Sequence, residues 1–197
     1  SLLYLTTKTR PDLAHAVSVC GRSVENPSRK DMTSIKRILK YLNGNTSLGI
    51  TYSKAKSTDT LVAYSDSDYA GDVSTRRSTT GFVIFYSGGP VSWTSRRQPI
   101  VATSTTEAEY ISAADCARTL VYLKCFLEEL SGKNVNCEMH IDNQSAIDLI
   151  NNGILNRRSK HIDVRYHYIK EKVDEGLIQI KYCPTNVQIA DILTKAL

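Results

Sequence analysis

The stretch Leu61-Val62-Ala63-Tyr64-Ser65-Asp66-Ser67-Asp68 decides the fold, because an apolar run ends there in acidic residues at a turn. Two further β-type runs follow at residues 81–86 and 91–94, and the turn residues 87–90 separate them. Short runs rich in β-branched and aromatic residues, bounded by turn residues, are typical of strands. We therefore expect three consecutive strands, the first of which brings Asp66 to one end of a sheet.

A long helix is predicted after the third strand. Ser104-Thr-Thr-Glu107 has the spacing of a capping box, in which the first and last side chains satisfy backbone N–H groups at a helix start. Apolar residues recur through Leu130 before Ser131-Gly132 ends the pattern, which predicts a helix of about 26 residues. The remaining elements are predicted as a strand, two helices, a strand and a final helix, at residues 135–141, 145–151, 162–173, 177–182 and 187–197. This order predicts an α/β protein with a mixed sheet covered by helices.

The charge of the chain is unevenly distributed. Residues 1–58 contain ten basic and three acidic residues, a net charge of +7, whereas residues 59–197 contain fifteen and seventeen, a net charge of −2. The first segment has helical apolar spacing up to Asn43-Gly44 and a β-type run at 48–52. We expect residues 1–58 to form a helical connector and residues 59–197 to form the α/β domain. Within this segment we predict a helix that begins at about Ser28 and ends at Asn43-Gly44. Five of its basic residues form either a solvated face or a surface for phosphates: Arg29, Lys30, Lys36, Arg37 and Lys40.

Composition excludes several classes of protein. No run approaches the roughly 20 apolar residues of a membrane span and no secretory signal opens the chain, so we expect no membrane partner. The five cysteines form no CxxC pair, which argues against a disulfide framework or a structural zinc site and indicates reduced thiols inside a cell. The net charge of +5 fits contact with nucleic acid but does not establish it.

Four acidic residues lie at the ends of predicted elements. Asp66 and Asp142 each follow a strand, and Glu109 and Asp191 each lie in the first turn of a helix. Each residue has a structural explanation when it is taken alone. Asp66 can start a turn, Asp142 can cap a helix, and the helix dipole favours an acid at the other two positions.

Glu109 is the most informative of the four acids. It begins a helical stripe whose other members are apolar: Ala113, Cys116, Leu120, Leu123 and Leu127. A lone carboxylate on a core-facing stripe costs several kcal/mol unless a cation compensates for it. Four acids that converge at one edge of a sheet repel one another unless divalent cations hold them, and all-oxygen ligands favour Mg²⁺ or Mn²⁺. Two such ions about 4 Å apart are an arrangement used in phosphodiester hydrolysis.

Longer motifs run in order along essentially the whole chain. They include Thr9-Arg-Pro-Asp12, Lys36-Arg-Ile-Leu-Lys-Tyr-Leu-Asn-Gly44, Tyr64-Ser-Asp-Ser-Asp-Tyr-Ala-Gly-Asp72, Ser104-Thr-Thr-Glu-Ala-Glu-Tyr110, Asp142-Asn-Gln-Ser-Ala-Ile147, Lys160-His-Ile-Asp163 and Gln188-Ile-Ala-Asp-Ile-Leu-Thr-Lys195. With these motifs the chain resembles the C-terminal part of the Pol polyprotein of Ty1/copia-type retrotransposons. That part joins the end of reverse transcriptase to a ribonuclease H domain.

The resemblance implies a ribonuclease H-like fold, in which a mixed five-stranded sheet is flanked by helices and preceded by a helical connector. It implies that Asp66, Glu109, Asp142 and Asp191 are the catalytic and metal-binding carboxylates, with two Mg²⁺ ions as cofactors and Mn²⁺ as an alternative. Asp66 would bridge the ions, Glu109 and Asp142 would bind one of them, and Asp191 would bind the other. The implied activity is endonucleolytic hydrolysis of the RNA strand of RNA/DNA hybrids during reverse transcription.

The resemblance also implies partners and a location. The partners are an RNA/DNA hybrid and the reverse transcriptase portion of the same polyprotein, with no small-molecule substrate. The location is intracellular, in a cytoplasmic virus-like particle, with the nucleus as a second candidate. Basic edges and turns supply the predicted nucleic-acid contacts, for which a solvated turn is the alternative explanation: Arg76, Arg77, Arg96, Arg97, Asn143, Arg158, Lys160 and His161.

Two features depart from the family pattern. Many relatives carry a histidine in the loop before the last helix, whereas residues 182–187 contain none. No polymerase Asp-Asp motif precedes Ser1, so this chain is not expected to copy a template.

Two other functions compete with the nuclease. Asp66-Ser-Asp68 also fits the DxD motif of nucleotide-sugar glycosyltransferases, although that reading leaves the other acids unexplained. The chain also fits an inactive or domesticated Pol fragment that binds nucleic acid or serves as a structural module. All four acids are intact, so decay is not visible where it should matter first.

Overall fold

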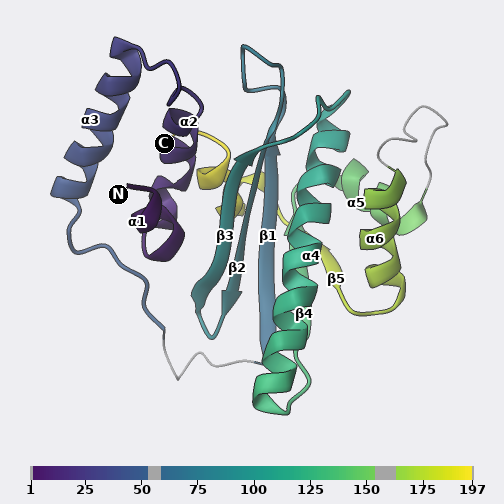
Figure 1. Cartoon of the computed structure of the whole chain (residues 1–197). Helices are drawn as coiled ribbons and strands as arrows, with labels where there is room; N and C mark the ends of the chain where they lie inside the picture. Colours follow the sequence, from purple (N-terminus) through teal and green to yellow (C-terminus); the bar gives the residue numbers. More distant parts are fainter. Residues whose placement is uncertain (1, 53–58, 154–162, 197) are drawn as a thin grey trace.

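A mixed five-stranded sheet forms the centre of the computed structural model, which describes residues 2–52, 59–153 and 163–196 (Figure 1). The strands are β1 (Thr60–Asp68), β2 (Thr79–Tyr86), β3 (Gly89–Arg97), β4 (Asn136–Ile141) and β5 (Gln179–Tyr182), in the spatial order β3-β2-β1-β4-β5. β2 pairs antiparallel with both β1 and β3, whereas β4 pairs parallel with both β1 and β5. The predicted mixed sheet is confirmed.

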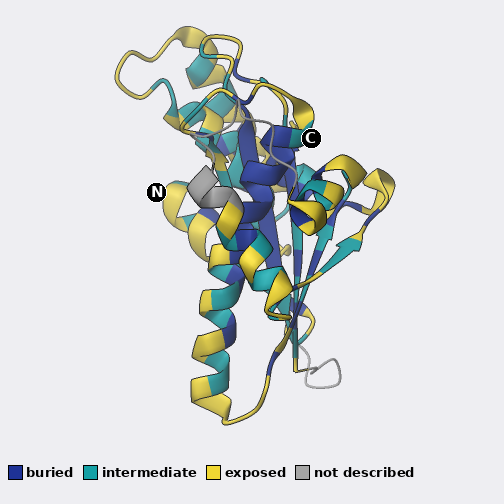
Figure 2. Cartoon of the chain, turned by 90° about the vertical axis from the view of Figure 1, so that its right-hand side faces the viewer, coloured by how far each residue is buried: buried dark blue, intermediate teal, exposed yellow. Residues whose placement is uncertain are grey.

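The long helix α4 (Thr105–Ser131) packs across the sheet beside β1. Its first half is buried, from Glu107 to Ala117, whereas its last turns are mostly exposed and extend past the sheet (Figure 2). The Ser104 hydroxyl accepts a hydrogen bond from the Glu107 N–H, as the capping box predicts. The Glu107 carboxylate, however, accepts from the backbone N–H of Thr103, so the reciprocal bond is made one residue earlier than predicted.

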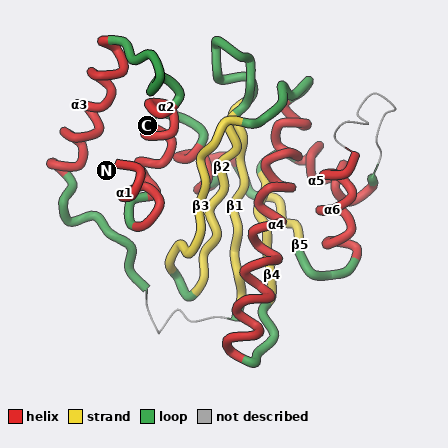
Figure 3. The backbone as a smooth tube through the Cα atoms, in the orientation of Figure 1, coloured by secondary structure: helices red, strands yellow, loops and turns green. Residues whose placement is uncertain are grey.

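The other helices lie at the two sides of the sheet (Figure 3). α5 (Gln144–Asn152) and α6 (Asp163–Asp174) pack against α4. At the opposite side, α1 (Leu2–Lys8), the 3-10 turn η1 (Pro11–Leu13), α2 (Ala14–Gly21) and α3 (Arg29–Gly44) gather near β3. Leu13 and Val17 pack with Ile38 of α3 in a small core of their own.

The N-terminal helices are bonded to the sheet. The indole N–H of Trp93, in β3, donates to the carbonyl oxygen of Thr6 in α1 over 2.5 Å. Arg22, which follows α2, donates to the hydroxyl of Thr79 at the start of β2 over 3.1 Å. These bonds hold α1 and α2 against the β3 side of the sheet.

Three local predictions are wrong. Residues 48–52 form no strand, because this run lies outside the sheet and has no partner strand. The third strand continues to Arg97, since β2 pairs with it over that whole length, so Arg96 and Arg97 lie on a strand and not in a turn. The predicted final helix is replaced by two 3-10 turns, η3 (Thr185–Val187) and η4 (Ile189–Leu193). Gln188 separates them in an extended conformation, and its side chain accepts from the N–H of Ala190.

Candidate active site

The parallel pairing of β1 with β4 brings two of the predicted acids together. Ser65 and Ile141 are partners in the register of the two strands, and each is followed directly by an aspartate, Asp66 and Asp142. Parallel strands end at the same edge of a sheet, and successive residues of a strand point to opposite faces. Ser65 accordingly bonds Ser112 of α4, whereas Asp66 accepts a hydrogen bond from Thr194, just after η4.

Glu109 reaches the same edge from the first turns of α4. One of its oxygens accepts from the backbone N–H of Ser67 over 2.9 Å and from the Ser67 hydroxyl over 3.1 Å. The second oxygen, Oε2, is buried and has no hydrogen-bond partner. Buried polar atoms normally have a partner, so an orphaned carboxylate oxygen is informative.

Asp66, Glu109 and Asp142 form one cluster, in which a carboxylate oxygen from each lies within 4.8 Å of the other two. Asp66 is 2% exposed and Glu109 6% exposed. Burial, with the charges of Asp66 and Asp142, raises the pKa of Glu109 to about 9 against the opposing Ser67 bonds. Burial likewise raises the pKa of Asp66 to about 6, although Thr194 and Lys195 oppose the shift. The cluster therefore resists holding its full negative charge without a cation.

Asp191 lies in η4, beside this cluster but outside the group of three. Its Oδ1 atom binds the ammonium nitrogen of Lys195 at 2.8 Å, and the same nitrogen is 4.0 Å from Oδ2 of Asp66. The negative charge of Asp191 is also close enough to raise the pKa of Asp66. Lys195 thus links the fourth predicted acid, Asp191, to Asp66.

The close approach of η4 to β2 depends on Gly81. A Cβ atom at this position would lie 2.5 Å from Cγ2 of Thr194 and 3.0 Å from Cβ of Leu193. The Gln188 side chain adds a second tie, because its Nε2 atom donates to the carbonyl oxygen of Ser65 over 3.0 Å. These contacts seat the segment that carries Asp191 against the strand ends.

The residues present fit a divalent metal ion. They offer only oxygen ligands, one of these oxygens is buried without a partner, and the cluster carries more negative charge than burial tolerates. Hard cations such as Mg²⁺ and Mn²⁺ prefer ligands of this kind. Asp66, Glu109 and Asp142 are the side chains that would hold such an ion.

The predicted nucleic-acid contacts fall into three groups. Arg76 and Arg77 lie in the loop between β1 and β2, with Arg76 exposed. Arg96 and Arg97 lie at the acid-bearing end of the sheet but are paired, Arg96 with Asp115 at 2.5 Å and Arg97 with Asp72 at 2.7 Å. The remaining four residues do not form one surface that the structure describes.

Asn143 caps α5 through a 2.9 Å bond from the N–H of Ala146, which is the capping role considered for Asp142. Arg158, Lys160 and His161 lie outside the described residues.

Sequence reasoning from single acids missed four polar neighbours of the cluster: Ser67, Thr185, Thr194 and Lys195. Thr185 lies in the loop that lacks a histidine, and its hydroxyl donates to Oδ2 of Asp142 over 2.9 Å. Ser67, Thr194 and Lys195 are all inside motifs quoted above, so their position next to the acids was an available signal.

The chain is similar to long retrotransposon proteins. The retrovirus-related Pol polyprotein from transposon TNT 1-94 of Nicotiana tabacum is 45% identical over 195 residues, which are 99% of this chain. The Pol polyprotein from transposon RE1 of Arabidopsis thaliana is 37% identical over 198 residues, which are 100% of this chain. The chain belongs to the Pol polyproteins of copia-type retrotransposons. It spans 14% of the TNT 1-94 Pol protein and 13% of the RE1 Pol protein. No protein-family model matches the chain.

The chain itself has the fold of ribonuclease H. The structure of LC11-RNase H1, isolated from compost by a metagenomic approach, aligns with a TM-score of 0.51 and 19% identity, over 70% of this chain and 94% of that one. Its structure in complex with an RNA/DNA hybrid aligns with a TM-score of 0.50 over 68% of this chain. The expected fold class is thus confirmed. Within the described ranges, no helix combines the length and apolarity that a membrane span requires.

Proposed function

We propose that the chain is a metal-dependent endonuclease that hydrolyses the RNA strand of RNA/DNA hybrids during retrotransposon reverse transcription. The observation that carries the proposal is the cluster of Asp66, Glu109 and Asp142 at the ends of β1 and β4, on a ribonuclease H fold. The hybrid bound by LC11-RNase H1 and the Pol relatives support this substrate.

Each acid has a proposed role. Asp66 would bridge two divalent ions, Glu109 and Asp142 would complete the ligands of one, and Asp191 would belong to the other. Two such ions, when bound, activate a water molecule and neutralise the charge that develops on the phosphate. Ser67 fixes the Glu109 carboxylate through two hydrogen bonds to one oxygen, and the unpartnered Oε2 would be the atom that holds an ion. Thr185 and Thr194 hold Asp142 and Asp66 in the same way.

The proposal extends to the rest of the chain. Residues 1–58 would be a helical connector from the end of reverse transcriptase and residues 59–197 the nuclease domain, with the reverse transcriptase portion of the polyprotein as a partner. The activity would take place inside the cell, in a cytoplasmic particle or in the nucleus. Arg76 and Arg77, in the loop between β1 and β2, would contact phosphates.

The test is cleavage of a labelled RNA/DNA hybrid with Mg²⁺, compared with duplex DNA and single-stranded RNA. We expect cutting of the RNA strand of the hybrid alone, and we expect Asp66→Asn and Asp142→Asn each to abolish it. Glu107→Gln is the matched control, because this neighbouring acid bonds Thr103 and not the cluster. Substantial cutting by either Asn variant would contradict the metal-site assignment. Equal inactivity of the wild type and the Asn variants would favour the binding-only alternative, and turnover of a sugar nucleotide instead would favour the glycosyltransferase.

A further inference from the structure

The exposed face of α3 carries positive charges that the protein does not neutralise. Its five basic residues are all exposed, and within the described residues none of their side chains forms an ion pair: Arg29, Lys30, Lys36, Arg37 and Lys40. The one acid of the helix, Asp31, is bound at the helix start, where it accepts from the backbone N–H of Ser28 over 2.7 Å. The helix therefore presents an uncompensated row of cations.

This row points away from the rest of the molecule. α3 buries Ile38, which packs with Leu13 and Val17 of the N-terminal helices. At 3.6 residues per turn, Lys36 and Lys40 lie about 160° around the helix axis from Ile38. The face with Lys36 and Lys40 is thus opposite the face that packs, with Lys30 about 80° from Ile38 at its flank, and a partner can approach it freely.

Three cations close to the acid cluster differ from those of α3, because they are already paired with acids. Arg96 binds Asp115, Arg97 binds Asp72, and Lys195 binds Asp191. Paired cations contribute little net positive potential to a surface. On the described surface, the largest set of unpaired cations on a single helix near the site is therefore that of α3.

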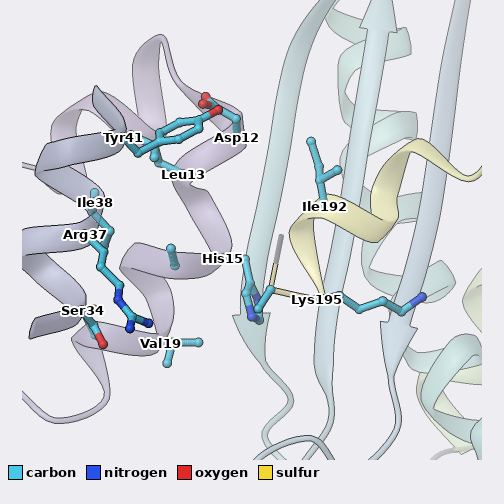
Figure 4. A pocket seen from close by; sticks show the side chains of 13 residues that line it. Asp12, Leu13, His15, Val19, Ser34, Arg37, Ile38, Tyr41, Ile192 and Lys195 are labelled. Atoms are coloured by element: carbon cyan, nitrogen blue, oxygen red, sulfur yellow. The ribbon is translucent and has the colours of Figure 1, made fainter. Parts of the chain in front are cut away.

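Two connections hold α3 at the acid-bearing end of the sheet. Arg22, between α2 and α3, bonds Thr79, whose partner in the register of β1 and β2 is Asp68. A cavity of about 370 Å³ lies between α3 and the chain around η4, with Arg37 on one wall and Lys195 on the other (Figure 4). Figure 4 shows the Lys195 side chain extending from this cavity toward the sheet, and its nitrogen binds Asp191. The unpaired cations of α3 therefore lie across this cavity from the segment that carries Asp191 and Lys195.

We propose that the lysine face of α3 binds the phosphate backbone of the nucleic-acid duplex that enters the acid cluster. The inference rests on the proposed nuclease function. The partner is a polyanion, because this face of α3 offers exposed cations with no acid among them. We expect the face to bind duplexes of any base sequence, because lysines contact phosphates as point charges. The helix is about 24 Å long, which matches roughly seven steps of a duplex strand. An acidic protein segment is the competing partner.

The test compares Lys30→Gln, Lys36→Gln and Lys40→Gln in one triple variant with a second triple variant of equal charge change, called the matched variant. The matched variant is Lys133→Gln, Lys170→Gln and Lys172→Gln, whose lysines lie just after α4 and in α6 and are paired with acids. Fluorescence anisotropy measures the binding of a labelled RNA/DNA hybrid and of duplex DNA between 50 and 200 mM salt, with Ca²⁺ in place of Mg²⁺ to slow cutting. Each lost phosphate contact lowers the slope of log K against log salt by about 0.9, so the α3 variant should lose roughly 2.7 and bind at least about tenfold more weakly at low salt.

The matched variant should keep the wild-type slope, because its lysines are already paired with acids. The α3 variant should keep the wild-type melting temperature, because its exchanged side chains are exposed and unpaired. With Mg²⁺ and hybrid, the α3 variant should raise KM and leave kcat unchanged. If the wild type binds both duplexes but cuts neither, and the α3 variant still loses the slope, the proposed function fails while this inference stands. The inference is overturned if the α3 variant binds like the matched variant, or if an acidic peptide binds the wild type more tightly than the duplexes do.

Discussion

Replacing Glu109 by glutamine should stabilise the metal-free protein. The buried carboxylate has one oxygen without a partner, and burial raises its pKa to about 9 from an ordinary 4.5. Between these two values the folded chain holds a proton that the unfolded chain has released. Stability therefore falls as the pH rises through this window, and glutamine, which is neutral at every pH, does not have this cost.

The size of the effect follows from the width of the window. At pH 7 the solution is about 2.5 units above the ordinary pKa, which at 1.36 kcal/mol per unit gives a cost of about 3 kcal/mol. At pH 5 the same reasoning gives less than about 1 kcal/mol. The Glu109→Gln variant should thus be more stable than the wild type by about 3 kcal/mol at pH 7 and nearly equal to it at pH 5.

Urea unfolding at pH 5, 6, 7 and 8, in EDTA and in Mg²⁺, measures this difference. In EDTA the advantage of the variant should grow with pH. In Mg²⁺ the wild type should recover most of the loss, because an ion satisfies the carboxylate, whereas the variant should gain little. Glu107→Gln is the control for the metal effect, because that carboxylate accepts from Thr103 and lies outside the acid cluster, so Mg²⁺ should stabilise this variant as much as it stabilises the wild type. A Glu109→Gln advantage that is constant from pH 5 to 8, or equal stabilisation of both proteins by Mg²⁺, would refute the reasoning.

Two further predictions concern the segment that carries Asp191. Gly81→Ala should lower the free energy of unfolding in urea by about 1–3 kcal/mol, because the added Cβ would collide with Thr194. The same variant should bind Mg²⁺ more weakly in calorimetry, and an unchanged affinity would contradict the packing of η4 against β2. Lys195→Met should cost at most about 1 kcal/mol in EDTA, since the lysine is half exposed, but should tighten Mg²⁺ binding by removing the cation that pairs with Asp191 and approaches Asp66. Weaker Mg²⁺ binding by this variant would instead indicate that the lysine helps to hold the acids in place.

Much of the fold was predictable because its signals are local. The apolar run before Asp66 and the stripe that follows Glu109 predict a strand and a helix with correct positions, and pairing with β2 carries the strand on to Asp68. The final helix was wrong for a reason that is not local. Gln188 bonds the carbonyl of Ser65, which is 123 residues away in the sequence, and this tie favours two short turns over one continuous helix.

The candidate site divides in the same way. Spacing selects Asp66, Glu109 and Asp142 as acids at the ends of elements, and the structure brings these three together. Sequence alone does not reveal that Lys195 pairs with Asp191 and approaches Asp66, because the position of the lysine depends on how η4 packs on β2. The pairing of Arg97 with Asp72 is likewise a tertiary contact between a strand end and a loop.

The sequence by itself determined the class of this protein, since the order of its elements and its motifs depend on residues close together in the chain. It also determined the charge division at residue 58, which is a property of composition. Only the tertiary structure decided which charges are neutralised. Ion pairs join distant residues, and the same arginine or lysine is either a partner of a buried acid or a free cation according to what packs beside it. That difference leaves the cations of α3 unpaired and those around the acid cluster bound.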